Sequence, residues 1–445
     1  MLLLLAKIYF ISFTAIILSK FIYNLYFLDK ERKFFASIPN LSATSAKLVI
    51  FIPLLNETRN FNKFISRFRP IINKHRDIKL VFITTNRENQ TDINRKNTID
   101  LVKDFINNLQ GTESEQYIHI HYPDINTTLA EQLNYALKIF GDANKEPLNK
   151  IFYGFYNADS NIQEKTIDTL FYLINKYPEQ AIFQQSSTFL QNHHEFSGLS
   201  GIILRTNGLL QTRWTFLHEI PRYFKSTTDN YWLIHCVTHG MFVESETIRK
   251  LGYFPTDSFG EDLYLGFIVR ANKYTIKPLP VLEASDTPST IMAMLRQKYV
   301  WFWGPLGYFY YWKRLKTKMP DVWAKNKKLI LAITILGIMQ SLNWVLAGWS
   351  FVIFLYCAFL IGQLTLGLMI ALGYLWITTY LSGMLYNKYV FEQNQKISSL
   401  ELTTCALLYP VLMFIHGLPP FFTIIKQIQL TLFPQKYLRP KTENN

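Results

Sequence analysis

The sequence predicts an α/β domain with a mostly parallel sheet, flanked on both sides by apolar helices long enough to cross a membrane. Residues 47 to about 285 alternate buried-strand patterns with helical patterns, and strands separated by helices usually form a parallel sheet covered on both faces. No residue from Leu329 to Tyr386 is charged, whereas one bilayer crossing needs only about 20 apolar residues. The chain therefore combines a globular domain with a membrane part.

The composition excludes several classes of protein. The chain has 445 residues, of which 49% are hydrophobic and 18% are charged, so it can bury a large core and is not a disordered protein. Its three cysteines are too widely spread for a disulfide framework, and no close Cys pair has the matching Cys or His pair of a structural zinc site. The net charge of +14 is compatible with nucleic acid, an anionic membrane or an anionic substrate, and its distribution decides among them.

Apolar segments at both ends of the chain predict membrane helices. Residues 1–28 are broken by only two lysines and lack the basic start and small-residue cleavage site of a signal peptide, so a retained transmembrane anchor is expected. The uncharged run of residues 329–386 is long enough for two or three spans. Residues 402–425 form a second uncharged run. Three prolines interrupt it, so a span followed by an interfacial piece is expected there.

Basic residues indicate the side of the membrane on which the α/β domain lies. Lys30, Arg32 and Lys33 follow the anchor, and residues 296–328 contain nine Lys or Arg against one acid. Because cytoplasmic flanks of membrane helices are enriched in Lys and Arg, residues 34–295 are predicted to be cytoplasmic, at the plasma (inner) membrane. A basic C-terminal tail favours four crossings over three after the domain. Tryptophans mixed with basic residues in 296–328 suit the lipid headgroup layer, so the membrane is an expected partner and nucleic acid is not.

Each element of the predicted domain has its own local pattern. Short apolar runs predict buried strands over residues 47–54, 79–86, 117–123 and 150–157. Apolar residues at helical spacing predict helices over residues 61–72, 98–109 and 129–140. A later helix is predicted over Leu263–Val269, which Glu261 and Asp262 precede.

Polar residues follow three of the predicted strands. Asn56 and Glu57 follow the first strand, residues 86–88 (Asn-Arg-Glu) follow the second, and residues 157–160 (Asn-Ala-Asp-Ser) follow the fourth. In open α/β sheets, ligands bind at the carboxyl ends of the strands. These polar residues are therefore the first candidates for a functional site.

Taken in order along the chain, these motifs resemble those of the membrane-bound family 2 glycosyltransferases, which include cellulose, hyaluronan and chitin synthases. The resemblance covers roughly residues 45 to 305. Its motifs are Pro53 with Asn56-Glu57, an x-x-Asp at residues 157–159, Glu261-Asp262 at a helix start, and Gln297-x-x-x-Trp301 before the membrane helices. The resemblance implies a GT-A fold. It also implies transfer of a sugar from a nucleotide-sugar donor, expected to be a UDP-sugar, to a glycan or lipid-linked acceptor at the cytoplasmic membrane face.

The resemblance implies roles for residues on the donor side. Asp159 matches the last position of the Asp-x-Asp metal motif and is the expected ligand of Mg²⁺ or Mn²⁺, with Asn157 offering a neutral oxygen. Donor-binding roles are also expected for Pro53, Asn56 and Glu57 of the nucleotide-side turn, for Asn134 of the preceding helix, and for Glu88 near the base or ribose. The simpler interpretation of Asp159 is a helix N-cap.

The resemblance also implies the catalytic and acceptor residues. Asp262 matches the general base of the family's Glu-Asp motif, and Glu261 lies beside it. One base and direct displacement invert the anomeric centre, so no second catalytic carboxylate is needed. Acceptor-side roles are expected for Gln297 and Trp301, which match the ends of a Gln-x-x-Arg-Trp motif, and for His239 and Gly240. The simpler interpretations are helix-dipole complementation for the carboxylates, a membrane-interface anchor for the tryptophan and a structural role for the histidine.

Four positions depart from the family pattern. Residues 84–86 are Thr-Thr-Asn where many relatives carry an Asp for the uracil ring, Asn157 replaces the first Asp of the metal motif, and Leu129 stands where a Lys is common. Val300 replaces the Arg of Gln-x-x-Arg-Trp, which holds the diphosphate or acceptor end in processive synthases. A processive polymerase is therefore not expected.

Two other functions compete with the enzyme. The departures are compatible with a catalytically altered, GT-A-like regulatory subunit of a polysaccharide synthesis complex, although retention of both Asp159 and Asp262 favours catalysis. A transporter is disfavoured, because the predicted spans contain few of the ionisable residues that usually mark substrate and ion paths.

Overall fold

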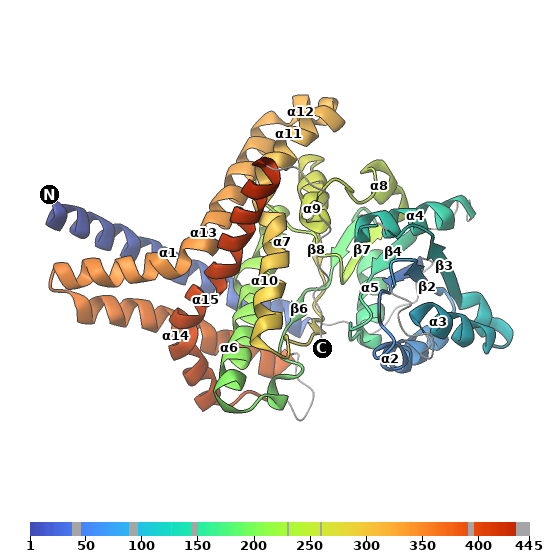
Figure 1. Ribbon diagram of the computed structural model, residues 1–445, viewed down its shortest axis with the longest axis horizontal. Helices are drawn as coiled ribbons and strands as arrows, with labels where there is room; N and C mark the ends of the chain where they lie inside the picture. The colour runs from blue at the N-terminus through green and yellow to red at the C-terminus, as the bar shows by residue number, and fades with distance from the viewer. Residues whose placement is uncertain are drawn as a thin grey trace.

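The computed structural model describes residues 1–37, 46–88, 97–125, 127–143, 150–228, 231–258, 260–389 and 396–432. An α/β domain lies at one end of the molecule, long helices extend away from the other end, and shorter helices lie between them (Figure 1). Most residues of the predicted basic tail lie outside the described residues.

The domain contains a seven-stranded sheet in the order β3-β2-β1-β4-β7-β5-β8. Its strands are β1 Lys47–Pro53, β2 Ile78–Thr85, β3 Tyr117–Tyr122, β4 Ile151–Phe155, β5 Ile182–Gln184, β7 Met241–Glu244 and β8 Lys277–Pro278. Among the strands of the described residues, β7 alone runs antiparallel to its neighbours, β4 and β5. A separate pair joins β6 Ser187–Thr188 to β9 Glu283–Ala284. The prediction of a mostly parallel sheet is confirmed.

Helices cover both faces of the sheet, which explains why its central strands are apolar throughout. The helices of the domain are α2 Phe61–Lys74, α3 Thr98–Asn107, α4 Leu129–Ala143, α5 Glu164–Lys176, α8 Ser245–Lys250 and α9 Glu261–Ala271. Successive side chains of a strand point to opposite faces. In β1, Val49 and Phe51 therefore pack with α4 and α9, whereas Leu48 and Ile50 pack with α2 and α5.

A layer of helices lies between the domain and the long helices (Figure 1). It consists of α6 Gly198–Trp214, a π-helical turn Thr215–Glu219, α7 Ile220–Ser226 and α10 Ile291–Leu306; two further short helices, α11 Tyr308–Lys318 and α12 Pro320–Lys325, lie at the top of the same view (Figure 1). This layer begins in the loop after β6 and resumes after β9, so it is directly connected to the small two-stranded sheet.

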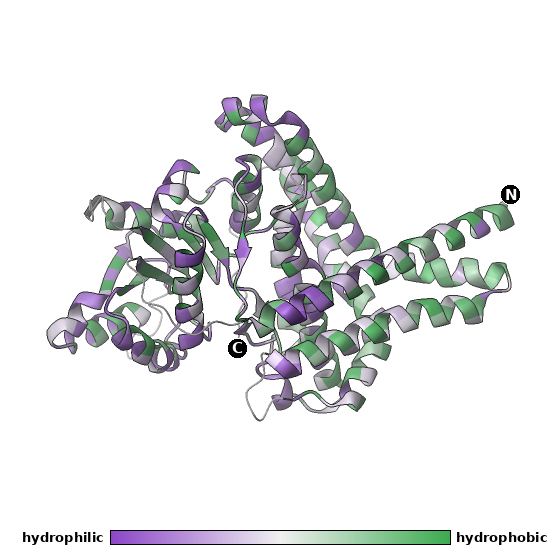
Figure 2. Cartoon of the chain, turned by 180° about the vertical axis from the view of Figure 1, so that it is seen from behind, coloured by the Kyte–Doolittle hydropathy of each residue, from purple (hydrophilic) through white to green (hydrophobic). Residues whose placement is uncertain are grey.

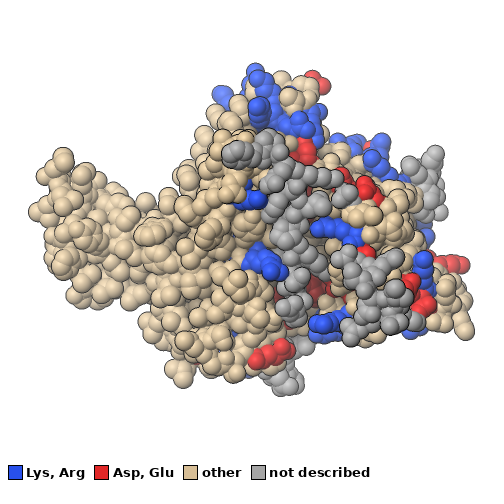
Figure 3. All heavy atoms as spheres, viewed as in Figure 1, with Lys and Arg blue, Asp and Glu red and all other residues tan. Residues whose placement is uncertain are grey.

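Four helices in the described part of the chain are long and apolar enough to cross a membrane: α1 Leu2–Ala36, α13 Lys327–Leu360, α14 Leu364–Tyr389 and α15 Ser399–Leu432. Apolar residues dominate the arm that these helices form (Figure 2). In the space-filling view, Lys, Arg, Asp and Glu gather over the domain and over α11 and α12, while the end of the arm shows none (Figure 3).

The C-terminal helices differ from two details of the sequence prediction. Residues 329–386 form two helices separated by a turn at Gly362, whose φ is +69°. The second uncharged run is one continuous helix, in which the carbonyl of His416 accepts from Trp344 Nε1 (3.2 Å) because Pro420, four residues later, has no N–H to donate. Counting described residues only, three candidate spans follow the domain rather than the favoured four.

Gly240 joins the ends of β4 and β5 in a conformation that only glycine accommodates without strain. Its φ is +72°, its N–H donates to the carbonyl of Phe155 (2.8 Å), and its carbonyl accepts from the N–H of Gln185 (2.7 Å). A Cβ atom here would lie 2.5 Å from the backbone oxygen of Gln185. Both the backbone angle and the lack of space therefore require glycine.

We expect Gly240→Ala to destabilise the protein by about 2–4 kcal/mol, because left-handed strain adds to a clash with backbone. Gly111→Ala is the matched control, since Gly111 also has positive φ (+59°) but nothing lies within 4 Å of its Cβ position; it should cost only about 1 kcal/mol. Thermal unfolding of the detergent-solubilised variants measures both. Equal midpoints for the two variants would contradict the steric argument.

Candidate active site

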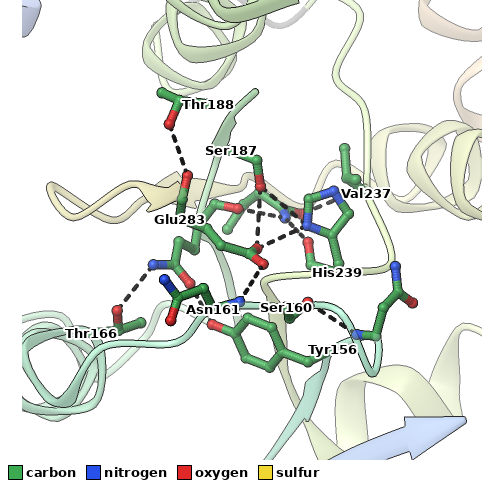
Figure 4. Close-up of polar contacts among 12 residues, drawn as sticks. Tyr156, Ser160, Asn161, Thr166, Ser187, Thr188, Val237, His239 and Glu283 are labelled. Carbon is green, nitrogen blue, oxygen red and sulfur yellow. Dashed lines mark hydrogen bonds and ion pairs between the residues drawn. The ribbon is translucent and has the colours of Figure 1, made fainter. Parts of the chain in front are cut away.

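A buried carboxylate, Glu283 in β9, connects the segments that form the candidate site (Figure 4). It is 1% exposed. Its Oε2 lies 3.0 Å from His239 Nδ1 and accepts from Ser187 Oγ (3.2 Å), while its Oε1 accepts from the backbone N–H of Asn161 (3.2 Å). One side chain thus binds the neighbouring strand β6, the loop after β4 and the loop before β7.

The His239–Glu283 contact is an ion pair. Burial alone would lower the pKa of His239, but the nearby Glu283, Glu219 and Asp159 carboxylates raise it to about 8. Burial alone would raise the pKa of Glu283, but His239 and two hydrogen-bond donors outweigh it and lower that pKa. At neutral pH the imidazole is therefore largely protonated and Glu283 ionised.

Asp159 lies in the turn after β4, next to this pair. The turn is closed by the N–H of Asn157, which donates to Ser160 Oγ (3.1 Å), and by the N–H of Ser160, which donates to the carbonyl of Asn157 (3.1 Å). Asp159 is exposed to solvent. Even so, the dense protein around it and the carboxylates of Glu57 and Glu283 raise its pKa. The structure therefore brings Asp159, Glu57, Glu283 and His239 together.

The turn after β1 is held by a chain of hydrogen bonds that ends at Glu88. The N–H of Glu57 donates to Thr98 Oγ1 (2.9 Å), which donates to Glu88 Oε1 (2.6 Å). Glu88 is 6% exposed, and its Oε2 has no hydrogen-bond partner among the residues described. Asn56 is exposed with φ +55°, and Pro53 is half-buried at the end of β1. The predicted donor-side turn and Glu88 thus belong to one connected unit.

The carboxyl ends of β2 and β3 carry a neutral polar network. Thr84 Oγ1 lies 2.7 Å from His119 Nε2 and 2.8 Å from His121 Nδ1, and His121 Nε2 lies 2.9 Å from Asn86 Oδ1. Burial lowers the pKa of His119 to about 4 and also lowers that of His121. This edge therefore presents uncharged groups where a carboxylate would be expected from the family pattern.

Glu261 and Asp262 form the first turn of α9. Glu261 is buried, Asp262 is half-buried, and Asp262 Oδ1 accepts from the N–H of Leu263 (2.7 Å). Burial and the charge of Asp262 together raise the pKa of Cys236 on one side of this turn. On the other side they do the same for Tyr308 and Tyr311 of α11. The helix start therefore lies between the loop that leads to His239 and the helices next to the membrane arm.

Asn134 of α4 hydrogen-bonds to the segment that leads to α9. Its Nδ2 donates to the carbonyl of Phe254 (2.7 Å) and its Oδ1 accepts from the N–H of Phe254 (2.9 Å). The side chain thus binds α4 to the segment that leads to α9. This contact positions the segment before α9, and a contact of Asn134 with the donor stays a prediction.

The predicted acceptor residues of α10 lie on the side of the site that faces the long helices. Gln297 Oε1 accepts from Gln211 Nε2 of α6 (3.0 Å). Trp301 is 39% exposed, its ring lies 6.1 Å from that of Phe189, and the ammonium of Lys298 lies 4.6 Å from its ring centroid. Because Phe189 directly follows β6, the paired partner of Glu283's strand, Trp301 borders the site.

The sequence profile of the Glycosyl transferase family group 2 matches residues 156–415. The chain belongs to this family. The match begins at the end of β4 and continues into α15, so it includes Asp159, His239, Asp262 and part of the membrane arm. The predictions of a family 2 glycosyltransferase and of the GT-A fold are confirmed.

No curated protein sequence matches this glycosyltransferase. It is similar to the solved structure of the mannosyltransferase PcManGT from Pyrobaculum calidifontis in complex with GDP-Man and Mn²⁺, with 12% identity, a TM-score of 0.49, and coverage of 97% of this chain and 100% of that chain. It is also similar to S. aureus TarS residues 1–349, with 12% identity, a TM-score of 0.37, and coverage of 82% and 91% respectively.

The residues around Asp159 fit a divalent cation. Within the described ranges, no three or more His, Cys, Asp or Glu side chains are arranged as a complete metal-binding cluster. Mg²⁺ in enzymes needs less from the protein, typically one or two carboxylates, with substrate phosphates completing its coordination. Three carboxylates near one imidazole leave an excess of negative charge, and the dense protein around Asp159, followed by the Glu57 and Glu283 carboxylates, raises its pKa. A cation shared with a donor diphosphate would remove that excess.

Sequence reasoning missed Glu283. It lies in a strand of two residues, 44 positions from His239 along the chain. Neither hydrophobic periodicity nor a family motif identifies so short a strand. The available signal was a single acid, Glu283, in an otherwise apolar stretch after residue 278.

We expect Glu283→Gln to remove the pH dependence that the ion pair gives to stability. Because the pKa of His239 is raised from 6.5 to about 8 in the folded state, the pair's contribution is complete below pH 6.5 and is lost as the pH rises through 8. The loss should be about 2 kcal/mol in the native protein. The free energy of unfolding, measured at pH 6 and pH 9, tests this. The control is Glu246→Gln, which removes an exposed ion pair between Glu246 and Arg249 on α8. An unchanged pH profile in Glu283→Gln would contradict the assignment.

Proposed function

We propose that the protein is an inverting glycosyltransferase that moves a sugar from a nucleotide-sugar donor to a glycan or lipid-linked acceptor at the cytoplasmic membrane face. The observation that carries the proposal is the gathering of Asp159, Glu57 and the His239–Glu283 pair beside the carboxyl ends of β1 and β4, in a member of this family. Ligands bind at this edge in open α/β sheets.

Asp159 and Asn157 would hold Mg²⁺ or Mn²⁺, which when bound would neutralise part of the diphosphate charge. The turn of Asn56 and Glu57 lies where the nucleotide would bind, and the Thr98–Glu88 contacts fix that turn. The protonated imidazole of His239 adds a positive charge on the same side, which favours the leaving diphosphate. A UDP-sugar stays the expected donor. The neutral network of Thr84, His119 and His121 lies where many relatives carry the Asp that binds the uracil ring.

Asp262 is proposed as the general base. The acceptor hydroxyl oxygen would attack the anomeric carbon as the bond from that carbon to the phosphate oxygen breaks, and its proton would pass to the Asp262 carboxylate. The electron pair of the broken bond leaves with the diphosphate. A single displacement inverts the anomeric centre. Glu261, buried in the same helical turn, would hold the helix start in place.

The protein is proposed to act distributively rather than as a processive polymerase. Val300, which stands in place of the motif arginine, is 3% exposed. Its position therefore faces the packed interior and offers no charge to a diphosphate or to a growing chain. Gln297 and Trp301 would contact the acceptor from the same helix.

We expect Asp262→Asn to lower turnover about 10²–10⁴-fold with little change in donor affinity, because the amide keeps the shape but accepts no proton. Asp159→Ala should instead abolish metal-dependent donor binding as well as transfer. Radiolabelled sugar transfer and donor binding with and without Mn²⁺ separate the two effects. Loss of donor affinity with an unchanged chemical step in Asp262→Asn would reassign that residue as a ligand. Absence of transfer by the native protein for every nucleotide sugar would favour the regulatory-subunit alternative.

The proposed membrane arrangement places residues 34–328 in the cytoplasm and the N-terminus outside. It is supported by four helices apolar enough to span a bilayer and by the basic residues that gather over α11 and α12 (Figure 3).

Ser114→Cys tests this arrangement, because Ser114 is exposed and the three native cysteines are buried. A membrane-impermeant thiol reagent added to intact cells should leave the variant unlabelled, and cell lysis should allow labelling. Labelling from outside intact cells would reverse the proposed orientation.

A further inference from the structure

Lys298 of α10 is a buried cation that the proposed chemistry does not use. It is 2% exposed. Its ammonium lies against the Trp301 ring, and in the described part of the chain no residue forms an ion pair with it or accepts a hydrogen bond from it. An ammonium taken out of water without a counter-ion costs several kcal/mol, and burial lowers the pKa of Lys298 to about 7. Such a group is stabilised by an anionic ligand.

The surroundings of Lys298 are polar and come from three helices. Gln297 accepts from Gln211 of α6, whose own Oε1 is buried and has no partner among described residues. His416 of α15 is an electrostatic neighbour of Lys298, and its Nε2 lies 2.8 Å from Asn207 Oδ1 of α6. Each of these side chains is at most 9% exposed. These buried polar side chains lie on three packed helices, and the Lys298 ammonium and the Gln297 Nε2 amide are the groups among them that can donate to an anion.

This cluster lies between the candidate active site and a candidate membrane helix. On one side, Trp301 contacts Phe189, which directly follows β6 of the site. On the other side, α10 packs along α15, and Thr423 Oγ1 of α15 donates to the carbonyl of Tyr299 (3.0 Å). α15 also exposes large apolar side chains, among them Leu418, Phe421 and Phe422. A ligand that spans this position needs an anionic head near the site and an apolar tail beside α15.

We propose that Lys298 binds the phosphate of a membrane-embedded acceptor, a lipid phosphate whose chain lies along α15. The inference rests on the proposed function and specifies the acceptor as an anionic lipid rather than a neutral glycan. A phosphate oxygen would become the hydrogen-bond partner of the ammonium, with the amides of Gln211 and Gln297 beside it. The Trp301 ring, partly exposed above the ammonium, would border the acceptor's path to Asp262.

The test measures binding of a short-chain prenyl phosphate, and of the matching prenyl alcohol, to the full chain in detergent without any donor. Lys298→Met removes the charge but keeps an apolar stem, and Lys298→Arg keeps the charge. Lys316→Met is the matched control, because Lys316 also lies over a tryptophan, 5.1 Å from the Trp323 ring, but is exposed. We expect Lys298→Met to weaken binding of the phosphate about 10- to 100-fold, with binding of the alcohol unchanged. Lys298→Arg and Lys316→Met should bind the phosphate nearly as the native chain does.

Competition distinguishes the possible sources of the phosphate. Inorganic phosphate and phosphatidylglycerol should displace the prenyl phosphate poorly; equal displacement by either would overturn the acceptor assignment. Equal binding of phosphate and alcohol by the native chain, or equal losses in Lys298→Met and Lys316→Met, would overturn the site. Because no donor is present, failure of sugar transfer does not affect this result. Prenyl phosphate binding without transfer contradicts only the proposed function, whereas transfer to a neutral acceptor without prenyl phosphate binding contradicts only this inference.

Discussion

The ion pair between His239 and Glu283 is the interaction on which the candidate site depends. A buried ionised carboxylate destabilises the folded protein unless it is paired and hydrogen-bonded. Glu283 meets both conditions through contacts to three separate segments. The same contacts fix the loop after β4, which carries Asp159, relative to the loop before β7, which carries His239. The ion pair that holds these segments together therefore also lies beside the edge of the sheet where the donor is proposed to bind.

Polar contacts also hold the domain on the membrane arm. Arg213 of α6 is buried, donates to Thr378 of α14 and to Tyr409 of α15, and lies 5.0 Å from the ring of Tyr409. Ser341 of α13 donates to the carbonyl of Pro305 at the end of α10 (2.6 Å). Each contact joins the helical layer to a different long helix. If the proposed function is right, a junction of this kind would hold an acceptor that enters from the membrane at a fixed position relative to Asp262, as an orientation-dependent displacement requires.

The sequence predicted those features that follow from local patterns. The strands were predictable because burial on both faces makes them continuous apolar runs, and Asp159 and Glu57 because the ends of parallel strands meet at one edge. Features that depend on distant contacts were not predictable. Asn134 binds Phe254, 120 residues away, so its positioning role has no local signal. The turn at Gly362 contains no charge, which left the number of spans in residues 329–386 open.

The two aspartates on which catalysis is proposed to depend lie in different electrostatic surroundings. Asp159 has two further carboxylates and one imidazolium as neighbours, and the dense protein around it, followed by the two carboxylates, raises its pKa. A group in such surroundings is best stabilised by a cation, which suits a metal ligand. Asp262 instead has the aromatic rings of Tyr308 and Tyr311 nearby and sits at a helix N-terminus, whose dipole favours an ionised carboxylate. An ionised carboxylate can accept a proton, so the surroundings of each aspartate are compatible with the role that its position in the family motif implies.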